Sequence, residues 1–206
     1  MRLLALLALP ALLVLAGCDG SAVDGPGGGP NDDPVDEPDD PPPGRDDAFD
    51  GACPDGVGVR LDPTGTYLRV HESDPAAPPT VIDLDGVGAA PGDALVLGRR
   101  GEFQIDGLGD PTRTRDEMIA VFSRSDVVLG PDEPLRVPDA IDAGDDFRTL
   151  ESRAGYIVTD IPEDFAVDQR TTVVVPPGAA YLIVAGHDSE YWNNTDDDED
   201  FRVCVE

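Results

Sequence analysis

Short apolar runs separated by glycine, proline and aspartate fill residues 51–206, and this pattern limits the folds open to the chain. Several runs alternate apolar and polar positions, as in Val81-Ile82-Asp83-Leu84, and no window keeps a helical period of apolar residues. Such alternation is typical of half-buried strands. Many short strands at this spacing predict an all-β domain over 51–206, folded as an antiparallel β-sandwich. The runs expected to form strands are 57–61, 66–71, 80–84, 94–97, 117–123, 156–159, 171–175, 181–185 and 201–205.

The N-terminal segment is different in kind. Met1-Arg2 precedes an apolar run over 3–14, which ends in Leu15-Ala16-Gly17-Cys18. A charged start, a short apolar run and small residues before a cleavage point are typical of a secretory signal. The ending resembles the bacterial lipobox, which implies that Cys18 is diacylated and becomes the first residue of the mature chain. We therefore expect a signal peptide over 1–17 and a bacterial envelope protein attached to a membrane through Cys18, on a face that the sequence leaves open.

The residues between Cys18 and the predicted domain contain almost nothing that a core could bury. Over 18–50 the chain consists mainly of proline, glycine and aspartate. Segments of this composition stay extended and do not pack, because they lack apolar area and repel themselves. We expect 18–50 to be a disordered tether that spaces the domain from the membrane.

The charge of the chain limits its partners. Acidic residues number 43 against 14 basic ones, which are all arginine, and the net charge is −29. Nucleic acid is excluded as a partner because a surface of this sign repels phosphate, whereas divalent cations are attracted. The acidic surface is also typical of proteins adapted to concentrated salt. The absence of lysine is explained at least as well by a GC-rich genome as by such adaptation.

Two cysteines remain once Cys18 is lipidated. Cys53 and Cys204 stand at opposite ends of the predicted domain. In an oxidising compartment an even remainder predicts a disulfide, although two free thiols are the alternative. A bond between them requires that the two ends of the domain lie side by side.

Catalytic motifs are missing from the sequence, so an enzyme is not expected. The two histidines are His71 and His187, and the latter is followed by Asp188 and Ser189. Neighbours on an extended strand point to opposite faces, so these three residues do not form a catalytic triad. No nucleophile elbow, phosphate loop or zinc-type helix motif is present.

Oxygen ligands are concentrated between 186 and 200. This stretch holds Asp188, Asn193-Asn194 and the acidic run 196–200, and Ca²⁺ binds six to eight oxygens of this kind. It is not an EF-hand: with Asn194 as the first position, acids stand third, fifth and seventh, but Glu199 occupies the glycine position and Val205 the bidentate glutamate position. The alternative is a solvated acidic hairpin loop.

Several segments together resemble one family. Val173-Val174-Val175-Pro176-Pro177-Gly178-Ala179-Ala180-Tyr181-Leu182-Ile183, followed by Asp188, Tyr191, Asn193-Asn194 and Phe201-Arg202-Val203, looks like the C-terminal half of the calcium-dependent galactose-binding lectin A family. The segments 91–97, with Gly101, and 118–121 resemble its first hairpin and middle strand.

The resemblance implies a jelly-roll sandwich and a Ca²⁺ held by Asp188, Asn193 and Asn194, with a sugar completing the metal's shell. Tyr191 and Trp192 are then expected beside the ligand, where Trp192 either stacks on a sugar ring or anchors the hairpin. The segment 110–116 lacks the family's galactose-contacting His and Gln, so galactose specificity is not carried over. A structural or protein-interaction domain without a small-molecule site is the alternative function.

Overall fold

Thirteen short strands make up the regular structure of the described residues, which are 53–54, 56–71, 73–106, 112–144, 150–154, 157–159 and 161–206 of the computed structural model. They all lie in one unit, Arg45–Glu206. The expected signal peptide over 1–17, Cys18 and the tether over 18–50 lie outside the described residues. No helix in the described part is long and apolar enough to cross a membrane.

The strands are β1 (Val57–Arg60), β2 (Thr80–Asp83), β3 (Ala94–Arg100), β4 (Phe103–Gln104), β5 (Thr114–Arg115), β6 (Met118–Ser123), β7 (Ala140–Ile141), β8 (Arg153–Ala154), β9 (Ile157–Val158), β10 (Phe165–Val167), β11 (Thr171–Val174), β12 (Tyr181–Gly186) and β13 (Arg202–Val205).

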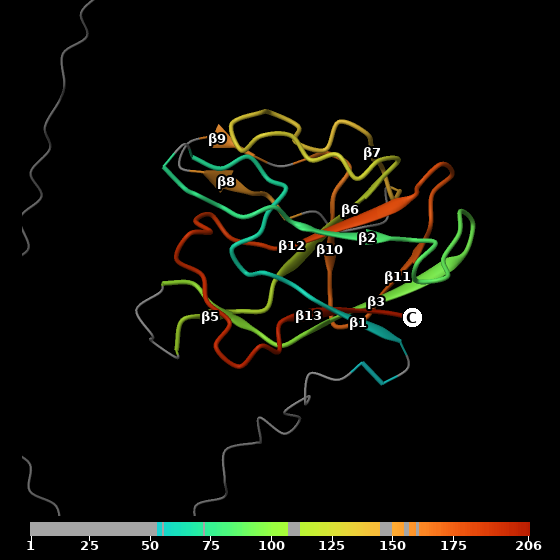
Figure 1. The fold of residues 1–206 in the computed structure, drawn as a ribbon, viewed down its shortest axis with the longest axis horizontal. Coiled ribbons are helices and arrows are strands. Elements are labelled where there is room, and N and C mark those ends of the chain that lie inside the picture. The colour runs from blue at the N-terminus through green and yellow to red at the C-terminus, as the bar shows by residue number, and fades with distance from the viewer. Residues whose placement is uncertain are drawn as a thin grey trace, which may run out of the picture. The chain divides into compact units, whose positions relative to one another are not determined.

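Two antiparallel sheets carry the fold. One has the order β1-β13-β3-β11, and the other has the order β10-β6-β12-β2 with β7 added beside β6. In Figure 1, strands β1, β3 and β13 of the first sheet lie below strands β2, β6 and β12 of the second. The main core lies between the sheets, with Leu97 and Val203 from the first and Phe122 and Leu182 from the second in one buried cluster. The prediction of an all-β antiparallel sandwich is confirmed, and its jelly-roll type stays a prediction.

The second sheet is covered on both faces. A separate buried cluster joins Ile119 of β6 and Ile183 of β12 to Tyr67, Leu68 and further loop residues on the side away from the first sheet. All six residues of β6 are therefore buried, which explains why this strand is an almost continuous apolar run rather than an alternating one. In β2, which alternates, Ile82 is buried and Val81 is exposed.

The strand expected over 66–71 does not form. This segment is irregular, and only Gly65, just before it, makes a bridge, with Ala77. Its carbonyl groups have a different partner, because the buried Arg136 guanidinium donates hydrogen bonds of 2.8 Å to the carbonyl oxygens of Thr66 and Leu68. Burial lowers the pKa of Arg136 from its ordinary value. The buried residues 66–68 thus cover a sheet face instead of joining a ladder.

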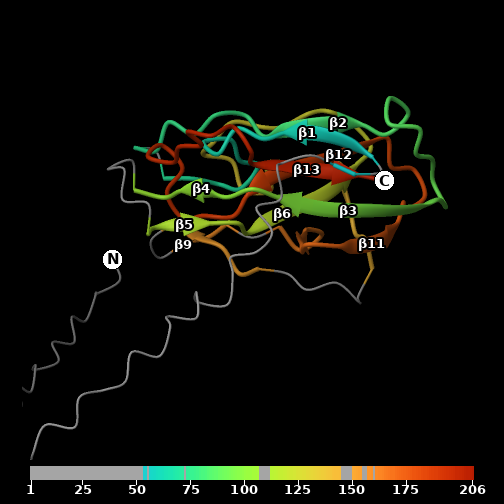
Figure 2. The same ribbon diagram turned by 90° about the horizontal axis from the view of Figure 1, so that it is seen from below.

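The disulfide predicted between Cys53 and Cys204 is present. β1 pairs along its whole length with β13, and Gly58 lies opposite Cys204. A Cβ atom on Gly58 would approach the Cys53 sulfur to 3.0 Å, so a glycine there leaves room for the bond. Figures 1 and 2 both place the C-terminus beside β1, as the disulfide requires. The start and the end of the domain are therefore held together at one edge of the first sheet.

Candidate functional site

The loop between β12 and β13, residues 187–201, is fixed to the rest of the domain by backbone hydrogen bonds; we call it the C-terminal loop. Thr195 and Gln104 of β4 exchange two backbone hydrogen bonds, of 2.8 and 3.0 Å. The buried Asp74 carboxylate accepts hydrogen bonds from the backbone amides of Tyr191 and Trp192, at 2.8 and 3.0 Å. Figure 1 shows this loop beside β5. The loop is rich in acids, but contacts from distant parts of the sequence fix its course.

Asp188 is buried in the first part of the C-terminal loop. Its side chain is 5% exposed, and burial raises the pKa of its carboxyl group above the ordinary value. Hydrogen bonds from the Ser189 amide and the Asn194 side chain, together with the nearby Arg115 charge, act in the opposite direction. Arg115 Nε lies 3.9 Å from Asp188 Oδ1, too far for a hydrogen bond. The carboxylate is thus incompletely neutralised by the protein.

Of the three residues expected to bind the metal, the structure brings Asp188 and Asn194 into contact. Asn194 is 3% exposed, and its amide nitrogen also donates to the Pro63 carbonyl oxygen at 3.0 Å. The Oδ1 atoms of Asn193 and Asn194 are buried, and neither accepts a hydrogen bond from the described residues. A buried acceptor without a donor is costly, by about 1–3 kcal/mol. These oxygens are therefore suited to a cation, which would satisfy them where the protein does not.

Tyr191 and Trp192 differ in what they can contact. Tyr191 is buried, and its hydroxyl donates to the Gly186 carbonyl and accepts from the Asp188 amide, each at 3.2 Å. Burial raises the pKa of this hydroxyl to about 12. Trp192 is 58% exposed. Tyr191 therefore holds the loop in shape, and Trp192 is the aromatic of the pair whose face is accessible to a ligand.

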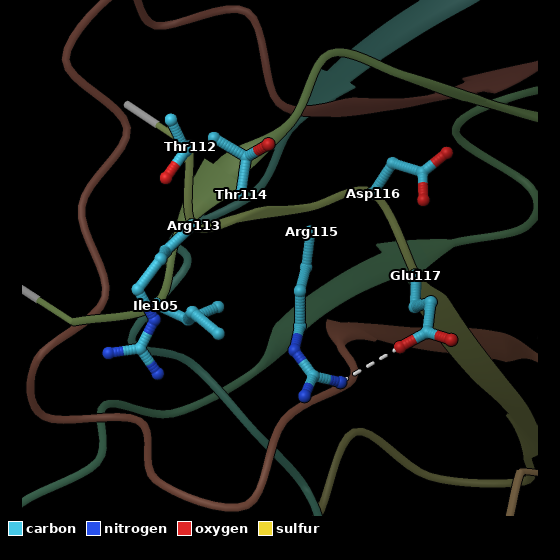
Figure 3. Close-up of a pocket in the computed structure, with 7 residues that line it drawn as sticks. All are labelled: Ile105, Thr112, Arg113, Thr114, Arg115, Asp116 and Glu117. Atoms are coloured by element: carbon cyan, nitrogen blue, oxygen red, sulfur yellow. Dashed lines mark hydrogen bonds and ion pairs between the residues drawn. The ribbon is translucent and has the colours of Figure 1, made fainter. Parts of the chain in front are cut away.

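An open cavity of about 450 Å³ lies at Arg115, the residue whose guanidinium group approaches Asp188. It is lined by Ile105, Thr112, Arg113, Thr114, Arg115, Asp116 and Glu117 (Figure 3). Arg115 links it to the site, since it pairs with Glu117 at 2.9 Å and reaches toward Asp188. The polar lining of the cavity combines hydroxyl, carboxylate and guanidinium groups.

His187 is paired with a serine that sequence proximity did not indicate. Its Nε2 lies 2.8 Å from the Ser152 hydroxyl, and its Nδ1 lies 3.6 Å from a Glu117 oxygen. The order serine, histidine, carboxylate is that of a hydrolase triad, but Ser152 is 2% exposed, so a substrate cannot reach its oxygen without a rearrangement. The arrangement fixes the start of the C-terminal loop and gives no support to catalysis.

Sequence reasoning missed three groups that shape this site. Asp74 lies far upstream of the residues that it holds, and Gln104 and Arg115 stand in strands of only two residues. No local pattern marks such positions, because their importance comes from pairing at long range.

Comparison of the chain with protein-family models, with curated proteins and with solved structures finds no match.

Proposed function

We propose that this chain is a lipid-anchored protein of a bacterial envelope whose sandwich domain binds Ca²⁺ at Asp188, Asn193 and Asn194. The observation that carries the proposal is the buried Asp188 carboxylate in contact with Asn194, in a loop where the side-chain oxygens of Asn193 and Asn194 are buried without donors. A hard cation with a preference for oxygen stabilises all three groups at once. The lipobox-like Leu15-Ala16-Gly17-Cys18 supports the anchor.

Carbohydrate is the ligand that we propose for the face next to this metal. The open cavity at Arg115 offers hydroxyl, carboxylate and guanidinium groups to sugar hydroxyls, and Trp192 offers an exposed ring for stacking. A metal with open coordination positions would take further sugar oxygens. The proposed activity is therefore calcium-dependent recognition of a glycan outside the membrane.

The test uses the full chain at fixed ionic strength, because a net charge of −29 attracts any divalent ion weakly. Ca²⁺ should raise the melting temperature of the native protein, since the ion binds the folded state and not the unfolded one; the gain is about 2.7 kcal/mol at a hundredfold excess over Kd. Asp188→Asn should lose a large part of that gain, and Mg²⁺ should substitute poorly.

An equal Ca²⁺-induced shift in wild type and Asp188→Asn would refute the metal site. Binding of the wild type to a glycan array in Ca²⁺, abolished by a chelator, tests the carbohydrate part separately. A chain that binds Ca²⁺ but no glycan under these conditions would be a calcium-stabilised structural or interaction domain of the envelope.

A further inference from the structure

Two arginines from one extended segment, Arg113 and Arg115, line the open cavity; we call them the arginine pair. The ladder between β4 and β5 extends one residue past each strand, since the Ile105 amide donates to the Arg113 carbonyl oxygen at 3.1 Å. Residues two apart on an extended segment point to the same face. Figure 3 shows both guanidinium groups on the same side of this segment. The pair therefore presents two positive charges to one side of the cavity.

Contacts within the protein use only a small part of what the arginine pair can donate. The Arg113 side chain is 56% exposed, and its acidic partner among the described residues is Asp106, with an oxygen 3.4 Å from Arg113 Nη1. Arg115 is partly exposed and donates from Nη1 to a Glu117 oxygen at 2.9 Å. A guanidinium group has five N–H donors in a planar fork. Both forks can therefore donate to a ligand while these contacts stay in place.

The surroundings of the arginine pair are electrically balanced, although acids outnumber arginines 43 to 14 in the chain. Three arginines here each have one acidic partner, in the pairs Arg113–Asp106, Arg115–Glu117 and Arg99–Asp116. In Figure 3 the Asp116 carboxylate points away from the arginine pair, in agreement with its 2.8 Å contact to Arg99. The remaining negative charge of the chain is screened over about 8 Å at physiological ionic strength. A single anionic group is therefore not repelled at this cavity, whereas a polyanion such as nucleic acid meets the acidic surface around it.

A carboxylate is the sugar substituent that suits this arrangement. It is planar and singly charged, and it accepts paired hydrogen bonds from a guanidinium fork. Two residues of an extended segment span about 6.6 Å, so the long side chains of Arg113 and Arg115 can converge on one such group. A neutral sugar offers hydroxyls alone and forms none of these charge-assisted hydrogen bonds through a carboxylate. Ile105, beside Arg113 in Figure 3, adds an apolar surface for a sugar ring.

We propose that the glycan bound at this cavity is acidic, and that a sugar carboxylate binds between Arg113 and Arg115. The inference rests on the proposed function, because it names the class of glycan that the same site takes. Arg115 connects the carboxylate to the metal site, since its Nε lies 3.9 Å from Asp188 Oδ1. A Ca²⁺ ion at Asp188 would offset the negative charge that this residue places near the ligand. Ca²⁺ and the acidic sugar should therefore each strengthen the binding of the other.

The test measures binding of the full chain, in Ca²⁺, to an array of matched glycan pairs. One pair ends in glucuronate or glucose, and the other ends in galacturonate or galactose. The two members of a pair differ in one group, which is a carboxylate in the first and a hydroxymethyl in the second. The wild type should bind the acidic member of at least one pair at least tenfold more tightly than its neutral partner, and the difference should shrink as the salt concentration rises.

Arg113→Gln is the key variant, because it removes an exposed guanidinium group and leaves the proposed Ca²⁺ ligands in place. It should abolish most of the preference for the acidic glycan and keep the Ca²⁺-induced rise in melting temperature. Arg113→Lys keeps the charge without the planar fork, so it should retain only part of the preference. The matched control is Arg170→Gln, which removes the same charge from an exposed arginine that pairs with Glu206 and should bind as the wild type does.

Equal binding of both members of each pair by the wild type would overturn this proposal and leave calcium-dependent recognition of a glycan in place. An Arg113→Gln variant that keeps the full preference would also overturn it, because the carboxylate would then bind elsewhere. Binding of neither member of either pair would overturn it as well. Binding to no glycan of any kind in Ca²⁺ is the separate result that refutes the carbohydrate part of the proposed function.

Discussion

The disulfide that joins the two ends of the domain offers the clearest stability prediction. Cys53 and Cys204 are 151 residues apart in sequence, so the bond closes a loop that contains nearly the whole domain. In the chain-entropy model, a loop of this length restricts the unfolded state by about 5 kcal/mol. Replacing both cysteines by alanine releases that restriction, so the free energy of unfolding should fall by about that amount. Because 1 kcal/mol corresponds to about 2–4 °C in a domain of this size, the melting temperature should fall by about 10–20 °C.

The assay is urea and thermal unfolding of wild type, the double alanine variant and reduced wild type, with Cys18→Ser as the control that keeps the disulfide. Reduced wild type should behave as the double variant does. β1 is an edge strand whose partner strand holds Cys204, so it should lose protection from hydrogen exchange first. A double variant within 1 kcal/mol of wild type would refute the reasoning, because it would mean that the unfolded chain is already compact.

Three further predictions concern groups inside the domain. Arg136→Met should destabilise it by roughly 2–6 kcal/mol in urea unfolding, because it leaves two buried carbonyl oxygens without donors at about 1–3 kcal/mol each. Gly101→Ala should lower the melting temperature in a thermal melt, since φ is 70° and the new Cβ would collide with Asp200. In the absence of Ca²⁺, the raised pKa of Asp188 means that the folded state binds more protons than the unfolded state above pH 3.8. Stability should therefore fall as the pH rises through this window. Asp188→Asn should reduce that fall in a series of thermal melts at different pH values.

The sequence predicted the sandwich well where strands are long enough to show a period. β2, β3, β6, β11, β12 and β13 all fall on expected runs. It failed for 66–71, whose composition suits a strand, because the carbonyl groups of this segment are bound by Arg136 from a distant loop. The two-residue strands β4, β5, β7 and β8 and the three-residue strand β10 were missed, since runs this short carry no periodic signal. Both the strand wrongly expected over 66–71 and the short strands that were missed depend on tertiary contacts, which a local sequence pattern does not show.

The candidate site shows a similar division between composition and geometry. Acidic and amide oxygens over 188–200 can be read from the sequence, and they predicted a cation-binding loop there. What the sequence does not contain is the position of Gln104 opposite Thr195, or the path by which Asp74 holds Tyr191. Glu199 has a φ of 62°, a backbone conformation that its position in the sequence did not indicate.

Contacts outside its acidic run fix the course of the C-terminal loop. Its repulsive carboxylates are opposed by apolar and backbone contacts elsewhere in the loop: the buried rings of Tyr191 and Phe201, the two amides on Asp74, and the paired backbone of Thr195. Rigid placement of this kind would reduce the ordering cost of binding the proposed cation. The left-handed backbone of Glu199 and the burial of the Asp196 carboxyl group both raise the energy of the loop. The contacts that fix the loop therefore oppose these costs, and a cation bound at the proposed Asp188 site would add to the same stabilisation.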